Sequence, residues 1–277
     1  MSIITAWNAH KDQINKLGSE RFANETGQTL TTFYSKDQWS EKNDENKQKR
    51  WRKKSSKNPK RKSNVLSPTL QNALWSLPHG LTEHIPGKLS LCIGMPVMLC
   101  HNEATECCIT KGAEGTVAGW QASIGSHGKP MLDTLFVKLT NPPKTIKFDG
   151  LPPNVVPITR RSTRIACKMW NDDVLSVSRS QVHVFSNFAM TDYAAQGRTR
   201  PDNVVELNNC RNHQSYYTCL SRSATAEGTI IIQGFDANKI TGGAHGNLRQ
   251  EFRQLEMLDA ITKMKYDGTL PVNIDGH

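Results

Sequence analysis

The chain has 277 residues, of which 36% are hydrophobic and 22% charged, and its formal net charge is +10. This length suffices for one large domain or two modest ones, and the composition excludes low-complexity, collagen-like and wholly disordered proteins. The sequence has no run of 18 apolar residues, and its start has no basic stretch followed by an apolar one. It therefore predicts neither a transmembrane helix nor a secretory signal.

Two elements are expected at the beginning of the chain. Residues 3–7 (IITAW) are short and apolar, which is typical of a buried strand. A helix is expected to follow from about Ala9 to Ala23, with Ile14 and Leu17 facing the protein interior.

A basic segment follows at residues 40–64, which we interpret as a linker. From Glu41 to Lys62 it has eleven Lys and Arg residues against three acidic ones, a local net charge of +8 that leaves +2 for the rest. Such a tract binds phosphates with a salt-sensitive affinity, and Trp51 within it could stack on a base. The candidate DNA contacts are Lys53, Lys54 and Arg61. The composition is also typical of a nuclear-import signal and of a solvated linker without a dedicated partner.

Residues 65–88 form a connecting segment, and residues 89–183 are rich in short strands. Apolar runs at 89–99, 115–122 and 135–139 are separated by Gly, Pro or Asn, and the pattern continues at 155–158 and 173–185. Several short strands at this spacing predict a small β-barrel or sandwich.

Cysteine and histidine gather at one place in this β-rich region. Cys100, His101, Cys107 and Cys108 make a zinc site conceivable, but their spacing fits no common Cys-x₂₋₄-Cys pair. Buried thiols are the favoured interpretation, so no metal ligand is predicted. The odd total of 7 cysteines, without an export signal, favours a reducing intracellular compartment.

After residue 188 the pattern changes to strands that alternate with helices. Val204–Leu207 and Thr229–Ile232 are expected to be buried strands, and the alternation predicts an α/β fold with a parallel sheet. Asn247–Tyr266 carries apolar residues at spacings of three and four, so it is expected to be an amphipathic helix docked on the core.

The strand at residues 3–7 would have to join this parallel sheet. Residues 1–39 and 184–277 would then form one discontinuous α/β domain, and residues 89–183 would be a small β-domain inserted into it.

Two segments carry candidate functional residues. In the first, TDYAAQGRT, Gly197 follows Gln196 and has no Cβ, so a phosphate or a DNA backbone could approach closely, and Arg198 adds a positive fork. In the second, YYTCLSRS, an arginine just beyond a buried helical turn could stabilise charge on a phosphoryl group during its transfer. The alternative is that this arginine, Arg222, caps its helix or pairs with Glu227.

These segments resemble a known family. FAMTDYAAQGRT followed by YYTCLSRS is similar to the fifth and sixth motifs of PIF-like, RecD-related superfamily-one DNA helicases. IITAWNAHKDQIN is similar to the fourth motif, and IGMPVMLCHNEATECCITKGAEGTV resembles the family's Gly-x-x-Val-Met-Leu segment. The ending GNLRQEFRQLEMLDAIT is similar to the tail of helicases of fungal Helitron-type mobile elements. The resemblance spans nearly the whole chain apart from the basic linker.

The resemblance implies a P-loop NTPase-type, second RecA-like α/β domain with an inserted small β-barrel. It also implies that Arg222 is the arginine finger and the catalytic group, with Gln196 and Gly197 at the junction of nucleotide and DNA. The residues that would contact single-stranded DNA are Asn8, Thr191, Tyr193 and Arg198.

The sequence departs from the family's pattern in two ways. The usual His-Lys pair is replaced by Tyr193-Ala194, so a DNA contact is lost or is replaced by stacking on the tyrosine. No G-x-x-x-x-G-K-[ST] segment is present, and no apolar strand ends in a paired Asp-Glu. The chain therefore lacks the phosphate-binding loop and the magnesium carboxylates, and ATP and Mg²⁺ are expected to bind only in a complete helicase.

The leading hypothesis is the C-terminal motor half of an ATP-dependent 5′→3′ DNA helicase. It would bind single-stranded DNA, work with a first RecA-like domain in cis or in trans, and not hydrolyse ATP alone. The alternatives are a non-enzymatic nucleic-acid-binding remnant of a mobile-element helicase and a truncated sequence whose other half lies upstream. We expect an intracellular, nuclear location and no membrane partner.

Overall fold

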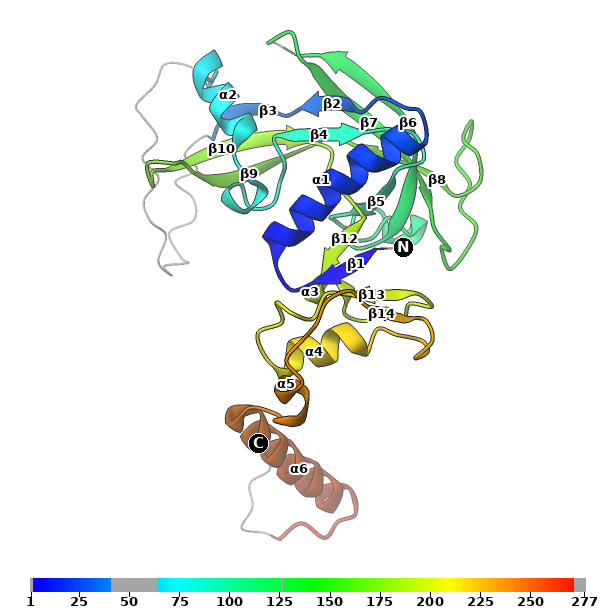
Figure 1. Cartoon of the computed structure of the whole chain (residues 1–277), viewed down its shortest axis with the longest axis vertical. Coiled ribbons are helices and arrows are strands. Elements are labelled where there is room, and N and C mark those ends of the chain that lie inside the picture. Colours follow the sequence, from blue (N-terminus) through cyan, green and yellow to red (C-terminus); the bar gives the residue numbers. More distant parts are fainter. Residues whose placement is uncertain (1, 41–63, 126, 272–277) are drawn as a thin grey trace. The chain divides into compact units, whose positions relative to one another are not determined.

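The computed structural model describes residues 2–40, 64–125 and 127–271, and these divide into two compact units. The smaller unit contains Ile3–Ala6 and the chain from Thr191 onward, and the larger contains Trp7–Met190. Figure 1 labels the elements of both. No helix in the described ranges is long and apolar enough to cross a membrane.

The smaller unit is built on parallel strands. β1 (Ile3–Thr5), β13 (Asn203–Val205) and β14 (Thr229–Ile231) pair in that order, with Ile3 opposite Val204 and Val204 opposite Ile230. All three residues of β13 are buried, as is usual for a central parallel strand. The crossover from β13 to β14 contains helix α4 (His213–Leu220). The predicted α/β fold with a parallel sheet, joined by the N-terminal strand, is confirmed.

The last helix was predicted correctly, but its packing was not. α6 (Gly246–Tyr266) covers the expected range, preceded by the short α5 (Asn238–Thr241). α6 has no buried residue, and Phe252, Leu255 and Leu258 are each about half exposed. The expected docking on the core is therefore wrong, because periodic spacing places apolar side chains on one face without specifying what covers that face.

The first helix of the larger unit, α1, buries a polar face. α1 (Asn8–Glu25) forms as expected, but Leu17 is 55% exposed and the inward positions are Lys11, Asn15, Ser19 and Ala23. Asn15 explains the difference: its Oδ1 accepts hydrogen bonds from the backbone N–H groups of Phe188 and Ala189, and its Nδ2 donates to the carbonyl of Ala189. The Asn15 side chain thus forms the hydrogen bonds that these buried backbone groups need, as a neighbouring strand would. The spacing of apolar residues in the sequence does not indicate such a role.

The strands described in the larger unit form three sheets. The largest has the order β11 (Val184–Ser186), β5 (Pro96–Leu99), β6 (Glu114–Ile124), β7 (Pro130–Leu139) and β8 (Val155–Thr159). The second has the order β3 (Lys36–Trp39), β10 (Val174–Gln181) and β9 (Arg161–Lys168), and the third pairs β2 (Thr31–Tyr34) with β4 (Lys88–Leu91). β12 (Ala189–Thr191) lies where the chain passes to the smaller unit.

One hydrophobic core joins the largest sheet to the β2–β4 pair. It includes Phe33 of β2, Leu91 of β4, Val97 of β5 and Val137 of β7, all of which are almost fully buried. A second cluster packs the β3-β10-β9 sheet against α2 (Pro68–Ser76), which begins at the Ser67 cap within the predicted connecting segment.

The domain boundaries predicted from the sequence differ from those of the two compact units in the folded chain. Residues 7–39 were assigned to the discontinuous α/β domain, whereas β2 and β3 within them pair with strands of the β-rich region. Closure of residues 89–183 into a barrel stays a prediction, as do the domain boundaries. Almost all of the basic linker, residues 41–63, lies outside the described residues.

Candidate nucleotide and single-strand interface

The first candidate motif forms a capped turn of helix. Thr191 is the N-cap of α3 (Asp192–Ala195), and its Oγ1 accepts a hydrogen bond from the Ala194 N–H at 3.3 Å. Buried Asp192 accepts a hydrogen bond from the Ser215 hydroxyl at 2.6 Å, which ties α3 to α4. Thr191 is half-buried, so its hydroxyl serves the helix cap as well as any DNA contact.

The residues after α3 are open to solvent. Gln196 and Gly197 are exposed, and Tyr193 is 79% exposed. Gly197 has φ +75°, in the left-handed region that glycine adopts without strain. A Cβ built there would have no atom within 4 Å, so the backbone is accessible at this point.

The two arginines of the motifs fold back onto their own helices. Arg198 donates from Nε to the Ala194 carbonyl at 3.1 Å. Arg222 donates from Nε to the Thr218 carbonyl at 3.1 Å and from Nη2 to the Ser221 hydroxyl at 2.7 Å. In the described part of the chain Arg222 forms no ion pair with Glu227, so helix capping is the alternative that agrees with the geometry.

The backbone brings the two motifs side by side. The Arg200 N–H donates to the Arg222 carbonyl at 2.7 Å, and the Ala224 N–H donates to the Arg200 carbonyl at 2.9 Å. Arg200 and Ser223 form an isolated parallel bridge. The loop that follows Gly197 therefore lies against the loop that contains Arg222.

A buried carboxylate at the other end of β13 escaped the sequence analysis. Glu206 is 5% exposed, and its carboxylate accepts hydrogen bonds from the Thr5 hydroxyl at 2.9 Å and from the Asn209 backbone and side-chain N–H groups. It lies at the carboxyl ends of β1 and β13, where ligands of parallel α/β sheets commonly bind. The signal was an acidic residue directly after the apolar pair Val204-Val205.

The remaining predicted DNA contacts are not part of this cluster as described. Asn8 begins α1 in the larger unit and is exposed. Lys53, Lys54 and Arg61 lie outside the described residues.

The residues present fit only part of an ATP–magnesium site. The guanidinium of Arg222 suits a phosphate oxygen, but no group of three or more His, Cys, Asp or Glu residues in the described ranges could hold a metal ion. No phosphate-binding loop occurs in the sequence. A nucleotide would therefore need most of its ligands from another domain.

A buried imidazole, that of His183, lies beside the cysteine and histidine cluster. His183 is 3% exposed, its ring centroid lies 4.6 Å from that of His101, and neither of its ring nitrogens has a hydrogen-bond partner among the described residues. The pKa of His183 is lowered to about 4, mainly by burial and in addition by the positive charges of the nearby His101 and Arg161. Burial also raises the pKa of the Cys100 thiol to about 12.

Comparison with known proteins places this fold among helicases. No family model matches the sequence, and no curated protein matches it. The structure is similar to that of the Pif1 helicase from Candida albicans, with a TM-score of 0.56 and 18% sequence identity over 92% of this chain and 49% of that one.

Two Bacteroides structures give the same result. Pif1 in complex with ADP-AlF3 and single-stranded DNA matches with a TM-score of 0.55 and 16% identity, over 92% of this chain and 45% of that one. Pif1 bound to single-stranded DNA matches with a TM-score of 0.51 and 14% identity, over 95% and 46%. The chain thus shares the fold of part of the Pif1 helicases and spans about half of their length.

Proposed function

We propose that the chain provides the second RecA-like domain of an ATP-dependent 5′→3′ DNA helicase of the Pif1 type. Arg222 serves as the arginine finger, and a first RecA-like domain supplies the phosphate-binding loop and the magnesium ligands. The observation that carries the proposal is the backbone pairing of Arg200 with Arg222 and Ala224, because it joins the two candidate motifs into one surface.

Arg222 would act by charge stabilisation. A guanidinium has five N–H donors, and the bonds to Thr218 and Ser221 fix its orientation while using only part of them. The remaining donors can meet the oxygens of a phosphoryl group in transfer, an effect worth roughly 10³–10⁵ in rate where an arginine finger operates. Without a phosphate-binding loop of its own, the chain would not hydrolyse ATP alone.

Single-stranded DNA would pass over the exposed turn at Gln196 and Gly197. The open space around Gly197 lets a phosphate approach the backbone. Tyr193 offers an exposed ring for base stacking in place of the family's His-Lys contact, and Thr191, Arg198 and Asn8 complete the proposed contacts. The similarity of the tail to Helitron helicases and the basic linker favour a nuclear mobile-element protein.

A second candidate function is a nucleic-acid-binding remnant without a motor role. The observation in its favour is that the side chain of Arg222 caps its own helix, which an arginine without a catalytic role would also do.

An ATPase assay distinguishes the helicase function from that of a nucleic-acid-binding remnant. The full chain is titrated into a separately prepared first RecA-like domain of a Pif1-type helicase, with oligothymidylate present. We expect DNA-dependent stimulation of ATP hydrolysis by the wild-type chain and its loss with Arg222→Ala. An absence of stimulation, with DNA binding retained, would favour the remnant.

A further inference from the structure

A buried asparagine holds the turn that carries Arg222. Asn203 is the first residue of β13 and is fully buried. Its Nδ2 donates to the carbonyl of Cys219 at 2.9 Å and to the hydroxyl of Ser223 at 2.8 Å. These acceptors lie three residues before Arg222 and one residue after it. A single amide group of the sheet therefore holds the chain on both sides of the arginine.

The bond to Cys219 closes the end of α4. The last four carbonyl groups of an α-helix have no partner within the helix itself. α4 ends at Leu220, so the Cys219 carbonyl belongs to this set, and Asn203 supplies its donor. Thr218, whose carbonyl accepts the bond from the Arg222 Nε, lies in the same turn. The part of α4 that orients the guanidinium is thereby tied to β13.

The backbone around Asn203 is itself fixed. Its N–H donates to the Gly228 carbonyl at 2.8 Å, and Asn203 lies opposite Thr229 of β14. A Cβ built on Gly228 would overlap the carbonyl oxygen of Pro201, so the chain is closely packed at this point. The sheet therefore provides a rigid position from which the amide reaches α4.

The amide oxygen of Asn203 argues against a purely stabilising role. Oδ1 is buried and has no hydrogen-bond partner among the described residues. Burying an acceptor without a partner costs about as much free energy as a pair of ordinary hydrogen bonds contributes. The net stabilisation from this side chain is therefore small, and what it provides is the geometry that its two donated bonds impose.

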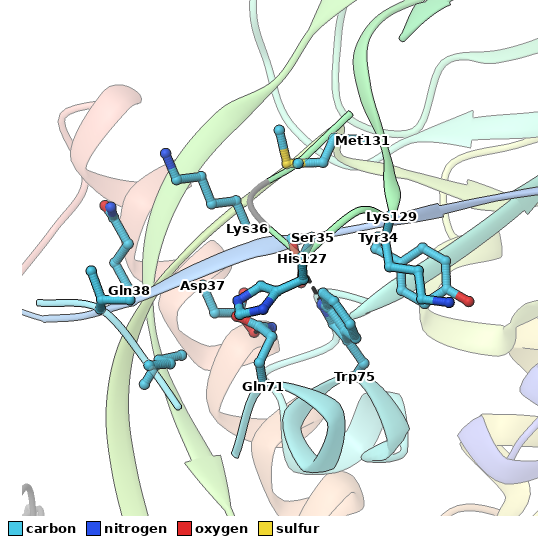
Figure 2. Close-up of a pocket in the computed structure, with 13 residues that line it drawn as sticks. Tyr34, Ser35, Lys36, Asp37, Gln38, Gln71, Trp75, His127, Lys129 and Met131 are labelled. Atoms are coloured by element: carbon cyan, nitrogen blue, oxygen red, sulfur yellow. Dashed lines mark hydrogen bonds between the residues drawn. The ribbon is translucent and has the colours of Figure 1, made fainter. Parts of the chain in front are cut away.

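A buried polar cluster in the larger unit shows the opposite balance. The Asp37 carboxylate accepts hydrogen bonds from Nε and Nη2 of Arg179 at 2.9 and 2.8 Å, and from the Ser35 hydroxyl and the Gln71 amide. Figure 2 shows Ser35, Asp37 and Gln71 where they line a small cavity. Both carboxylate oxygens thus have donors, as expected of a cluster that supports the fold, whereas Asn203 leaves its acceptor unpaired.

We propose that Asn203 is a positioning residue for the arginine finger and affects ATP hydrolysis only through the orientation of Arg222. Because the turn is fixed to the sheet, the guanidinium keeps its bonds to Thr218 and Ser221 and needs little rearrangement when a partner domain presents a phosphate. This inference rests on the proposed function of Arg222 and adds to it a buried residue that does not touch the nucleotide.

Steady-state kinetics test the coupling to Arg222. The full chain is added to the first RecA-like domain of a Pif1-type helicase with oligothymidylate. Asn203→Asp keeps the shape of the side chain but replaces Nδ2 by an oxygen, which repels the Cys219 carbonyl. We expect it to lower kcat by roughly 10²-fold with little change in KM, and to have no further effect in a chain that carries Arg222→Ala. An equal loss in both backgrounds would overturn the proposal.

Asn15→Asp is the matched control. Asn15 is also a buried asparagine whose Nδ2 donates to a backbone carbonyl, that of Ala189, but it belongs to the larger unit. We expect this variant to be less stable than the wild type and to keep its kcat at temperatures at which circular dichroism shows both variants folded. An equal fall of kcat in the control would attribute the effect of Asn203→Asp to general destabilisation.

Nuclear magnetic resonance provides a test that does not depend on ATP hydrolysis. The Arg222 Nε–H, which donates to the Thr218 carbonyl, should give a resolved ¹H–¹⁵N signal that is assigned by its loss in Arg222→Ala. We expect this signal to shift and broaden in Asn203→Asp and to be retained in Asn15→Asp. An unchanged signal in Asn203→Asp would contradict the positioning role.

The outcome is separable from that of the proposed function. If the chain does not stimulate ATP hydrolysis but the Arg222 signal responds to Asn203→Asp, the proposed function fails and the positioning of the arginine stands. If Arg222→Ala abolishes stimulation but Asn203→Asp changes neither kcat nor the signal, only the role of Asn203 fails.

Discussion

At the scale of single residues, Gly197 combines a backbone conformation that favours glycine with open space around its Cα atom. Its φ of +75° costs other L-residues roughly 1–2 kcal/mol, although a Cβ would clash with nothing. We therefore expect Gly197→Ala to lower the free energy of unfolding by about 1 kcal/mol. Urea denaturation measures this, and Gly234→Ala is the matched control, because Gly234 also has free space but no positive φ. Equal stability of the two variants would refute the conformational role.

His183 predicts a pH dependence of stability. Its pKa is lowered, mainly by burial, to about 4 in the folded state, against about 6.5 in the unfolded chain, so between these values the unfolded state binds more protons. The free energy of unfolding should therefore fall by up to roughly 3 kcal/mol as pH decreases from 6.5 to 4. In His183→Phe, which keeps a ring but cannot be charged, urea melts should show a shallower decline. The same decline in both proteins would exclude this cause.

At the scale of elements, α6 presents an uncovered apolar face. Because Leu255 and Leu258 are about half exposed, we expect Leu255→Gln and Leu258→Gln each to change the free energy of unfolding by less than about 0.5 kcal/mol. Leu207→Ala, at a fully buried residue after β13, should cost about 2–5 kcal/mol in the same urea melts. A loss above 1 kcal/mol at Leu255 would mean that the helix is packed in solution.

The sequence predicts some of these elements well, for physical reasons. β13 contains the apolar pair Val204-Val205, and its burial is the one expected of a central parallel strand. β14 forms at the expected place, but Ile230 and Ile231 are 51% and 39% exposed, so the prediction that this strand is buried is wrong. β9 was missed because Arg161–Lys168 alternates polar side chains with few apolar ones. The inward face of α1 was missed because Asn15 replaces apolar packing with backbone hydrogen bonds.

The functional residues and the buried polar ones also include some that the sequence predicts and some that it does not. Resemblance of local motifs identified Gln196, Gly197 and Arg222, which are close in sequence to recognisable turns. The Asp37–Arg179 pair joins residues 142 positions apart, and no local pattern connects them. This buried pair could be found only from the folded chain.

At the scale of the whole molecule, the charge is concentrated in one tract. Residues 41–62 hold +8 of the net +10, so they should dominate the salt dependence of DNA binding. We expect a neutral Gly/Ser segment of equal length in their place to weaken binding of oligothymidylate and to flatten the slope of log affinity against log salt. Fluorescence anisotropy at several salt concentrations measures both. Unchanged affinity and slope would show that the tract makes no phosphate contacts.

The central claim is that Arg222 acts on a nucleotide held by a partner domain. The most direct measurement is the steady-state kinetics of ATP hydrolysis by a first RecA-like domain saturated with this chain and with oligothymidylate. The account predicts that Arg222→Ala lowers kcat by about 10³-fold or more with little change in KM, that Arg222→Lys restores little of it, and that exposed Arg253→Ala in α6 has no effect. An unchanged kcat for Arg222→Ala would contradict it.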